Sequence, residues 1–205
     1  MPQNEDKMHW LALGDSYTIG QGVTLQERYP NQTNAILLAQ NILYNTPEII
    51  AVTGWTTSNL INALNNYTPI QPKYDVVTLL IGVNNQYQGR SLQEYNTECT
   101  QLAQRAIGYA GGVTKHVTIL SIPDWSVTPF AAGQNTQQIA TEIDSFNAIN
   151  KRIALQYNMN YIDITPSTRM AATDPSLVAA DRLHPSGLEY AKWAARLAVT
   201  IKQNK

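Results

Sequence analysis

Cysteine is nearly absent from this chain, and its scarcity excludes a fold that is held together by disulfide bonds. Cys99 is the single cysteine among 205 residues, so no disulfide bond within the chain is possible. Only three histidines accompany it, scattered along the sequence, so no zinc-binding pattern is present. We therefore predict no metal. The chain also lacks a phosphate-loop motif, and Gly14, Gly20 and Gly22 have the wrong spacing for a dinucleotide fingerprint, so we predict no organic cofactor. We expect Cys99 to be a small buried residue of a helix.

Charge is also scarce, which argues against two kinds of partner. Asp, Glu, Lys and Arg make up 14% of the residues, against about a quarter in typical proteins, and the formal net charge is −1. Nothing in this balance favours nucleic acid or an anionic membrane surface. Hydrophobic residues reach 43%, which is typical of a folded domain rather than a disordered chain.

Long apolar runs are missing as well. No stretch approaches the roughly 18 apolar residues of a membrane span, so we expect no integral membrane association. The start, MPQNEDKMHW, shows no signal peptide, although a chain whose signal had been removed would look the same. Compartment and oligomeric state therefore stay open. The length favours a single domain over residues 1–205, with residues 1–8 as a polar tail.

Short apolar runs alternate with amphipathic segments along the chain. The predicted strands cover residues 9–14, 48–54, 75–82, 116–122 and 160–165. The predicted helices cover residues 29–43, 58–66, 92–109, 137–157 and 186–201. This alternation predicts an α/β protein whose parallel sheet is covered by helices on both faces. In such a sheet ligands bind at the carboxyl ends of the strands, so functional residues should follow strands directly.

One hydroxyl and one imidazole meet that requirement. Ser16 follows the first predicted strand, and its hydroxyl needs a neighbouring base to become nucleophilic. His9 and His116 lie at strand starts, the wrong edge of the sheet, whereas His184 follows the fifth strand. Asp181, three residues earlier, could accept the imidazole N–H and stabilise the protonated form.

Acyl transfer also needs hydrogen-bond donors for the oxygen that becomes negative. Gly54 follows the second strand and leaves its backbone N–H open to approach. Asn84 follows the third strand within GVN (82–84) and offers a side-chain amide. Together with the Ser16 N–H, these groups give three donors from three loops.

The blocks at residues 14–16 (GDS), 54, 82–84 and 181–184 (DRLH) resemble, in order and spacing, those of the SGNH (GDSL-type) hydrolases. The resemblance implies a three-layer α/β/α sandwich, flavodoxin-like, with a five-stranded parallel sheet. It implies Ser16 as nucleophile, His184 as base and Asp181 as orienting acid. The oxyanion hole would comprise the Ser16 and Gly54 N–H groups and the Asn84 amide.

The function expected from this resemblance is a serine esterase that forms a covalent acyl-enzyme, with short acyl or acetyl esters favoured. Its substrate would be a small-molecule ester of a sugar, a lipid or an aryl alcohol. Lysophospholipase or thioesterase activity on longer chains remains an alternative within the family. A catalytically silent module that binds carbohydrate or lipid is another.

Two positions depart from the family pattern. Tyr17 replaces the usual leucine after the serine, and Asn85 replaces the usual aspartate after Asn84. Neither position performs chemistry, but Asn85 removes a carboxylate that would brace the loop. The sequence alone does not show whether Asn85 weakens the segment that carries Asn84.

Four aromatic residues follow the second, third and fourth strands and are candidates for the wall of a substrate pocket: Trp55, Tyr87, Trp125 and Phe130. Ordinary packing at the rim of the sheet explains each of them equally well. The irregular stretch 123–138 is the best candidate for a loop that shapes the substrate site.

Simpler interpretations compete with the catalytic one. Asp15 and Ser16 could merely cap backbone N–H groups, Asn84 could be a turn residue, and His184 could hydrogen-bond Asp181 for structure alone. A glycosidase would instead use a pair of carboxylates. Its candidates near the crevice are Asp124, Asp163, Asp174 and Asp181.

Overall fold

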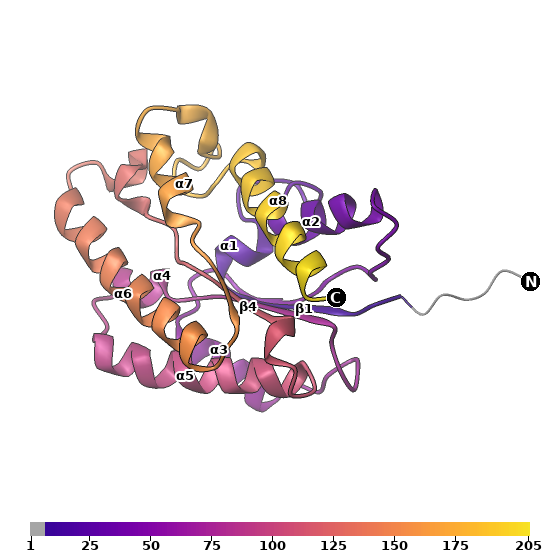
Figure 1. Ribbon diagram of the computed structural model, residues 1–205. Coiled ribbons are helices and arrows are strands. Elements are labelled where there is room, and N and C mark those ends of the chain that lie inside the picture. Colours follow the sequence, from indigo (N-terminus) through magenta and orange to yellow (C-terminus); the bar gives the residue numbers. More distant parts are fainter. Residues whose placement is uncertain (1–6) are drawn as a thin grey trace, which may run out of the picture.

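A five-stranded parallel sheet forms the centre of the computed structural model, which describes residues 7–205 (Figure 1). The strands are β1 (Trp10–Gly14), β2 (Glu48–Ala51), β3 (Val76–Leu80), β4 (Val117–Leu120) and β5 (Asn160–Ile162). Their order is β2-β1-β3-β4-β5, and every neighbouring pair is parallel. The predicted α/β sandwich with five parallel strands is thereby confirmed.

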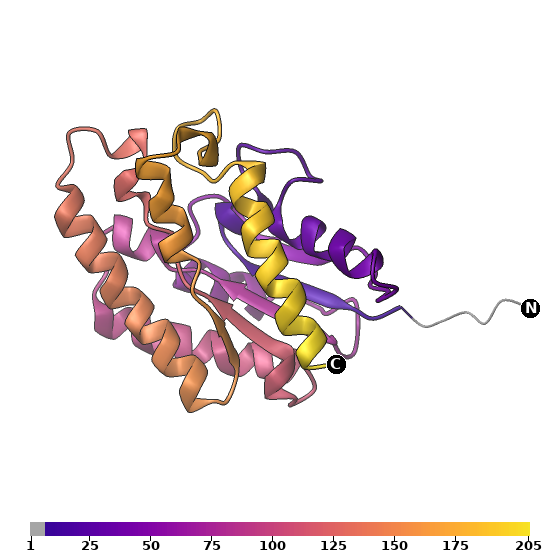
Figure 2. The same cartoon turned by 45° about the horizontal axis from the view of Figure 1, so that its top comes forward.

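Helices cover both faces of the sheet (Figures 1 and 2). On one face lie α2 (Tyr29–Leu38) and α8 (Gly187–Gln203); on the other lie α3 (Thr57–Asn65), α5 (Leu92–Tyr109) and α6 (Thr136–Gln156). The residues of β1 and β3 are all buried, because apolar side chains on both faces of these strands meet a helix layer.

The first and last long helices pack against each other. The Tyr29 ring of α2 lies 6.4 Å from the Tyr190 ring and 6.2 Å from the Trp193 ring of α8, measured between ring centroids. Tyr190, Trp193, Leu197 and Ile201 recur at helical spacing and are all buried. This contact joins the two ends of the chain on one face of the sheet.

Element boundaries differ from the sequence prediction where local backbone chemistry intervenes. The helix predicted over 29–43 ends at Leu38, and Asn41 beyond it adopts a left-handed φ of 59°. The fifth strand ends at Ile162, because Thr165 and Pro166 begin the short helix α7 (Thr165–Arg169). The short helices α1 (Ser16–Ile19) and α4 (Val83–Tyr87) have too few residues to show a helical period.

The expected polar tail over residues 1–8 falls mostly outside the described residues. Of its last two residues, Met8 forms a parallel bridge with Tyr44 and packs against the core. Across residues 7–205, no helix has the length and apolar character needed to cross a membrane. Cys99 is buried in α5, and burial raises the pKa of its thiol to about 12.

Candidate active site

Ser16 occupies a tight turn between β1 and α1. Asp15 caps α1, its Oδ1 accepting the Tyr17 N–H at 3.0 Å, so that Ser16 becomes the first residue of the helix. Gly14 permits this turn, because a Cβ there would lie 2.1 Å from Thr18 Oγ1 and 2.4 Å from the carbonyl oxygen of Leu80. The sequence therefore places a hydroxyl at the carboxyl edge of the sheet.

His184 reaches this hydroxyl from a turn far along the chain. Asp181 Oδ1 accepts the backbone N–H groups of Leu183 at 3.0 Å and His184 at 2.9 Å, which closes the turn. Asp181 Oδ2 lies 2.7 Å from His184 Nδ1, and His184 Nε2 lies 2.9 Å from Ser16 Oγ. The fold thus assembles a continuous carboxylate, imidazole and hydroxyl chain from residues 168 positions apart.

The surroundings of Asp181, His184 and Ser16 favour a neutral imidazole beside an ionised carboxylate. Burial lowers the pKa of His184 and outweighs the hydrogen bond and charge of Asp181, which act in the opposite direction. Burial alone would raise the pKa of Asp181, but the N–H groups of His184 and Leu183 and the imidazole bring the pKa below its ordinary value. At neutral pH the imidazole can therefore accept the Ser16 proton, and Asp181 can stabilise the resulting cation.

The three residues predicted to supply the oxyanion-hole donors, Ser16, Gly54 and Asn84, all line one cavity. Ser16 is the first residue of α1, so its N–H has no acceptor within the helix. Gly54 has a φ of +81°, a left-handed conformation that favours glycine, and none of the hydrogen bonds among residues 7–205 uses its N–H. Asn84 Nδ2 donates to the Trp55 carbonyl at 3.0 Å and lies 3.5 Å from Asp15 Oδ2. The first contact orients the amide, and the second is too long to hold the other N–H firmly.

Asn85 of α4 braces the segment around Asn84 through neutral hydrogen bonds, where the family pattern has a carboxylate. Its side chain is fully buried; Oδ1 accepts the Thr57 N–H at 3.0 Å and Nδ2 donates to Thr57 Oγ1 at 2.6 Å. The Thr57 hydroxyl in turn donates to Glu98 of α5. Helix α4, which carries Asn84, is therefore joined to the start of α3, just after the loop that carries Gly54.

The two residues on either side of Ser16 also shape the site, which was not expected. The Tyr17 ring packs against the imidazole of His184, with ring centroids 4.8 Å apart. Asp15 is fully buried beneath the turn, and burial raises the pKa of its carboxyl to about 7. The position of Asp15 inside the GDS block was the signal that could have indicated its part in the turn.

A cavity of about 190 Å³ opens over Ser16. Three of the four predicted aromatic residues line it: Tyr87, Trp125 and Phe130. Their ring centroids lie 5.5 to 6.2 Å apart, so they form one continuous apolar wall. Trp55 does not line the cavity; its side chain packs against the core, and only its carbonyl serves the site by orienting Asn84. The sequence did not single out five further lining residues: Gln21, Thr53, Val83, Leu183 and the ring of Tyr17.

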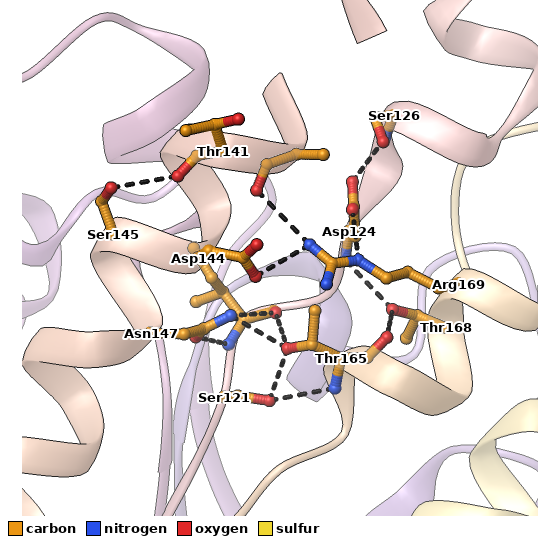
Figure 3. Close-up of polar contacts among 12 residues, drawn as sticks. Ser121, Asp124, Ser126, Thr141, Asp144, Ser145, Asn147, Thr165, Thr168 and Arg169 are labelled. Carbon is orange, nitrogen blue, oxygen red and sulfur yellow. Dashed lines mark hydrogen bonds and ion pairs between the residues drawn. The ribbon is translucent and has the colours of Figure 1, made fainter. Parts of the chain in front are cut away.

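The loop that carries Trp125 and Phe130 is fixed by an ion-pair network (Figure 3). Arg169 of α7 contacts Asp124 of the loop and Asp144 of α6, each at 2.8 Å. Asp124 also accepts the Ser126 N–H at 2.9 Å. The loop that carries the aromatic wall is therefore held in place by α6 and α7.

The carboxylates considered for a glycosidase each serve local structure instead. Asp124 pairs with Arg169, Asp163 accepts hydrogen bonds from Ser121 and the Thr165 N–H, and Asp174 caps the turn that contains Ser176. Asp181 is paired with His184. Within residues 7–205, no cluster of His, Cys, Asp and Glu could hold a metal ion.

The protein is a parallel α/β sandwich, and a hydroxyl, an imidazole and a carboxylate are hydrogen-bonded in series at the carboxyl edge of its sheet. This combination is typical of hydrolytic enzymes. Residues 12–192 match the model of the GDSL-like Lipase/Acylhydrolase family. The chain belongs to this family, and its class of reaction is ester hydrolysis. A sequence search of curated proteins found no match.

Solved structures share the fold at low sequence identity. A lipase/acylhydrolase from Enterococcus faecalis superimposes with a TM-score of 0.72 at 18% identity, covering 96% of each chain. TesA gives a TM-score of 0.73 at 16% identity, covering 96% of this chain and 99% of its own. An acetylxylan esterase from Geobacillus stearothermophilus gives 0.70 at 19% identity, covering 95% of this chain and 94% of its own.

Proposed function

We propose that this protein is a serine esterase that cleaves esters of short acyl groups through a covalent acyl-enzyme. The observation that carries the proposal is the continuous chain from Asp181 through His184 to Ser16, with contacts of 2.7 and 2.9 Å. These are hydrogen-bond distances, as a nucleophile and its base require.

In the proposed reaction His184 acts first as a base and then as an acid. His184 Nε2 takes the proton of Ser16 as Oγ attacks the ester carbonyl, and the charge on the carbonyl oxygen meets the N–H groups of Ser16 and Gly54 and the amide of Asn84. His184 then gives its proton to the alcohol oxygen as the carbon–oxygen bond to the alcohol breaks. Water repeats the cycle on the acyl-enzyme and releases the acid.

The cavity supports the preference for short acyl groups. Its volume of about 190 Å³ is below the 300 to 1,000 Å³ typical of sites for drug-sized ligands. The wall of Tyr87, Trp125 and Phe130 is apolar, which suits an acyl group rather than a charged one. Long acyl chains would extend into solvent beyond Phe130, whose side chain is 44% exposed.

The nucleophile can be tested directly. A fluorophosphonate probe should label Ser16, and p-nitrophenyl esters should be cleaved fastest with acetyl to butyryl groups. Ser16→Ala should abolish labelling and lower kcat by at least about 10³-fold, since the three residues act as a unit. Wild-type turnover by Ser16→Ala would refute the proposal. A silent binding module would instead leave the wild type unlabelled.

A further inference from the structure

A second hollow adjoins the cavity over Ser16 and shares two of its wall residues, Tyr87 and Trp125. Its volume, about 280 Å³, exceeds the 190 Å³ of the first cavity. It lies between α4 and the start of α6, and the loop fixed by Arg169 borders it. The two hollows therefore border each other at Tyr87 and Trp125.

The polar side chains of the groove are mostly neutral amides. Gln134, Asn135 and Gln138 line it, beside Glu142. Glu142 accepts N–H groups from Gln86 at 2.7 Å and from Gln138 at 2.8 Å, so its two oxygens are already engaged. No Lys, Arg or His is among the described residues that line the groove.

This lining selects for a ligand chemistry. Gln138 gives one N–H to Glu142 and keeps the other, and within residues 7–205 the Gln134 carboxamide forms no hydrogen bond. A hydroxyl group both donates and accepts, so the amide groups that remain open suit a ligand with several hydroxyls. An anionic headgroup would meet the Glu142 carboxylate with no cation in the lining to offset it. A purely apolar alcohol would strip water from the amides without replacing their hydrogen bonds.

The aromatic wall suits the remaining surface of such a ligand. Tyr87 is 56% exposed, unusual for a large ring, and it stands where the cavity and the groove meet. Trp125 packs edge-on against it, with ring centroids 5.5 Å apart, and limits its freedom. A rigid aromatic face beside amides matches a ring that carries hydroxyls at its edge and C–H groups on its face.

We propose that this groove binds the alcohol half of the ester and that this alcohol is a neutral sugar residue. The proposal rests on the esterase function proposed above and names its substrate class: O-acylated saccharides. The acyl group occupies the cavity over Ser16, and the sugar that leaves with the His184 proton lies in the amide-lined groove.

Kinetics test the groove through a ratio that removes general effects on the catalytic centre. We would compare kcat/KM for a panel of mono-O-acetylated methyl pyranosides with kcat/KM for p-nitrophenyl acetate. Gln138→Ala and Tyr87→Leu should each lower this ratio about fivefold or more, mainly through KM, as loss of one hydrogen bond or one stacking face predicts. Gln137→Ala is the matched control, because Gln137 is an exposed neighbour on α6 that does not line the groove. A ratio that both groove variants leave within twofold of the wild type would overturn the proposal.

Binding tests the groove independently of catalysis. Unacylated methyl pyranosides from the same panel should bind the Ser16→Ala protein in calorimetry, and Gln138→Ala in that background should weaken them about fivefold. If the wild type fails to cleave p-nitrophenyl acetate, the esterase proposal fails while this measurement still decides the groove. Absence of binding by every member of the panel would overturn the sugar assignment even in an active esterase.

Discussion

The hydrogen bonds around Thr57 predict that restoring the family's usual aspartate at position 85 will harm this protein. In the native chain an Asn85 N–H points at Thr57 Oγ1, and the Thr57 O–H points at Glu98. Each acceptor therefore receives its own proton. Asn85→Asp removes the amide protons, so that the single hydroxyl proton of Thr57 must serve two carboxylates.

The magnitude follows from the two interactions that change. Losing one hydrogen bond to a charged group costs about 1.5 to 3 kcal/mol. Two carboxylates about 5 Å apart repel by about 3 kcal/mol at an effective dielectric constant of about 20. Glu98 is only half-buried and can turn toward water, which relieves part of the repulsion. We expect Asn85→Asp to lower the free energy of unfolding by about 2 to 4 kcal/mol at pH 8.

Urea unfolding of four proteins measures this effect: wild type, Asn85→Asp, Glu98→Gln and the double variant. Glu98→Gln supplies an amide proton from the other side, so the Thr57 hydroxyl can turn and donate to the introduced aspartate. The double variant should recover at least half of the lost stability. The loss in Asn85→Asp should also shrink as the pH falls toward 4, because a buried carboxyl with a raised pKa takes up a proton. Strict additivity of the two substitutions, or a loss independent of pH, would refute the reasoning.

Three other predictions concern the catalytic chain and its support. Because burial lowers the pKa of His184 below its ordinary value of about 6.5, kcat/KM should fall to half of its maximum at a pH below 6.5; a half-maximal rate above pH 6.5 would contradict this. Asp181→Asn should lower kcat about 10²- to 10⁴-fold with normal thermal stability, and an unchanged kcat would show that the carboxylate is dispensable. Arg169→Ala leaves the buried Asp124 unpaired, so we expect about 1 to 3 kcal/mol less stability by urea unfolding and a raised KM for esters; an unchanged KM would mean that the aromatic wall stands without this support.

The sequence predicted the parts of this protein that depend on strand order and local motifs. Ser16 and His184 could be paired because parallel strands bring their carboxyl ends to one edge. Trp55 was misplaced because a side chain after a strand can turn toward the core or the crevice, and sequence does not record which. The brace at Asn85 was not predictable, because its partner Thr57 lies 28 residues before Asn85 and 41 residues before Glu98. The three short helices lack a period long enough to detect.

The packing of α2 against α8 has a consequence for biosynthesis. During translation the segment of the nucleophile leaves the ribosome before the segments of the imidazole and of α8, which follow it by 168 residues or more. Until α8 has been made, Tyr190 and Trp193 cannot pack on Tyr29, and His184 cannot reach Ser16. A product of premature termination would therefore retain most of the sheet-forming sequence and yet be chemically inert.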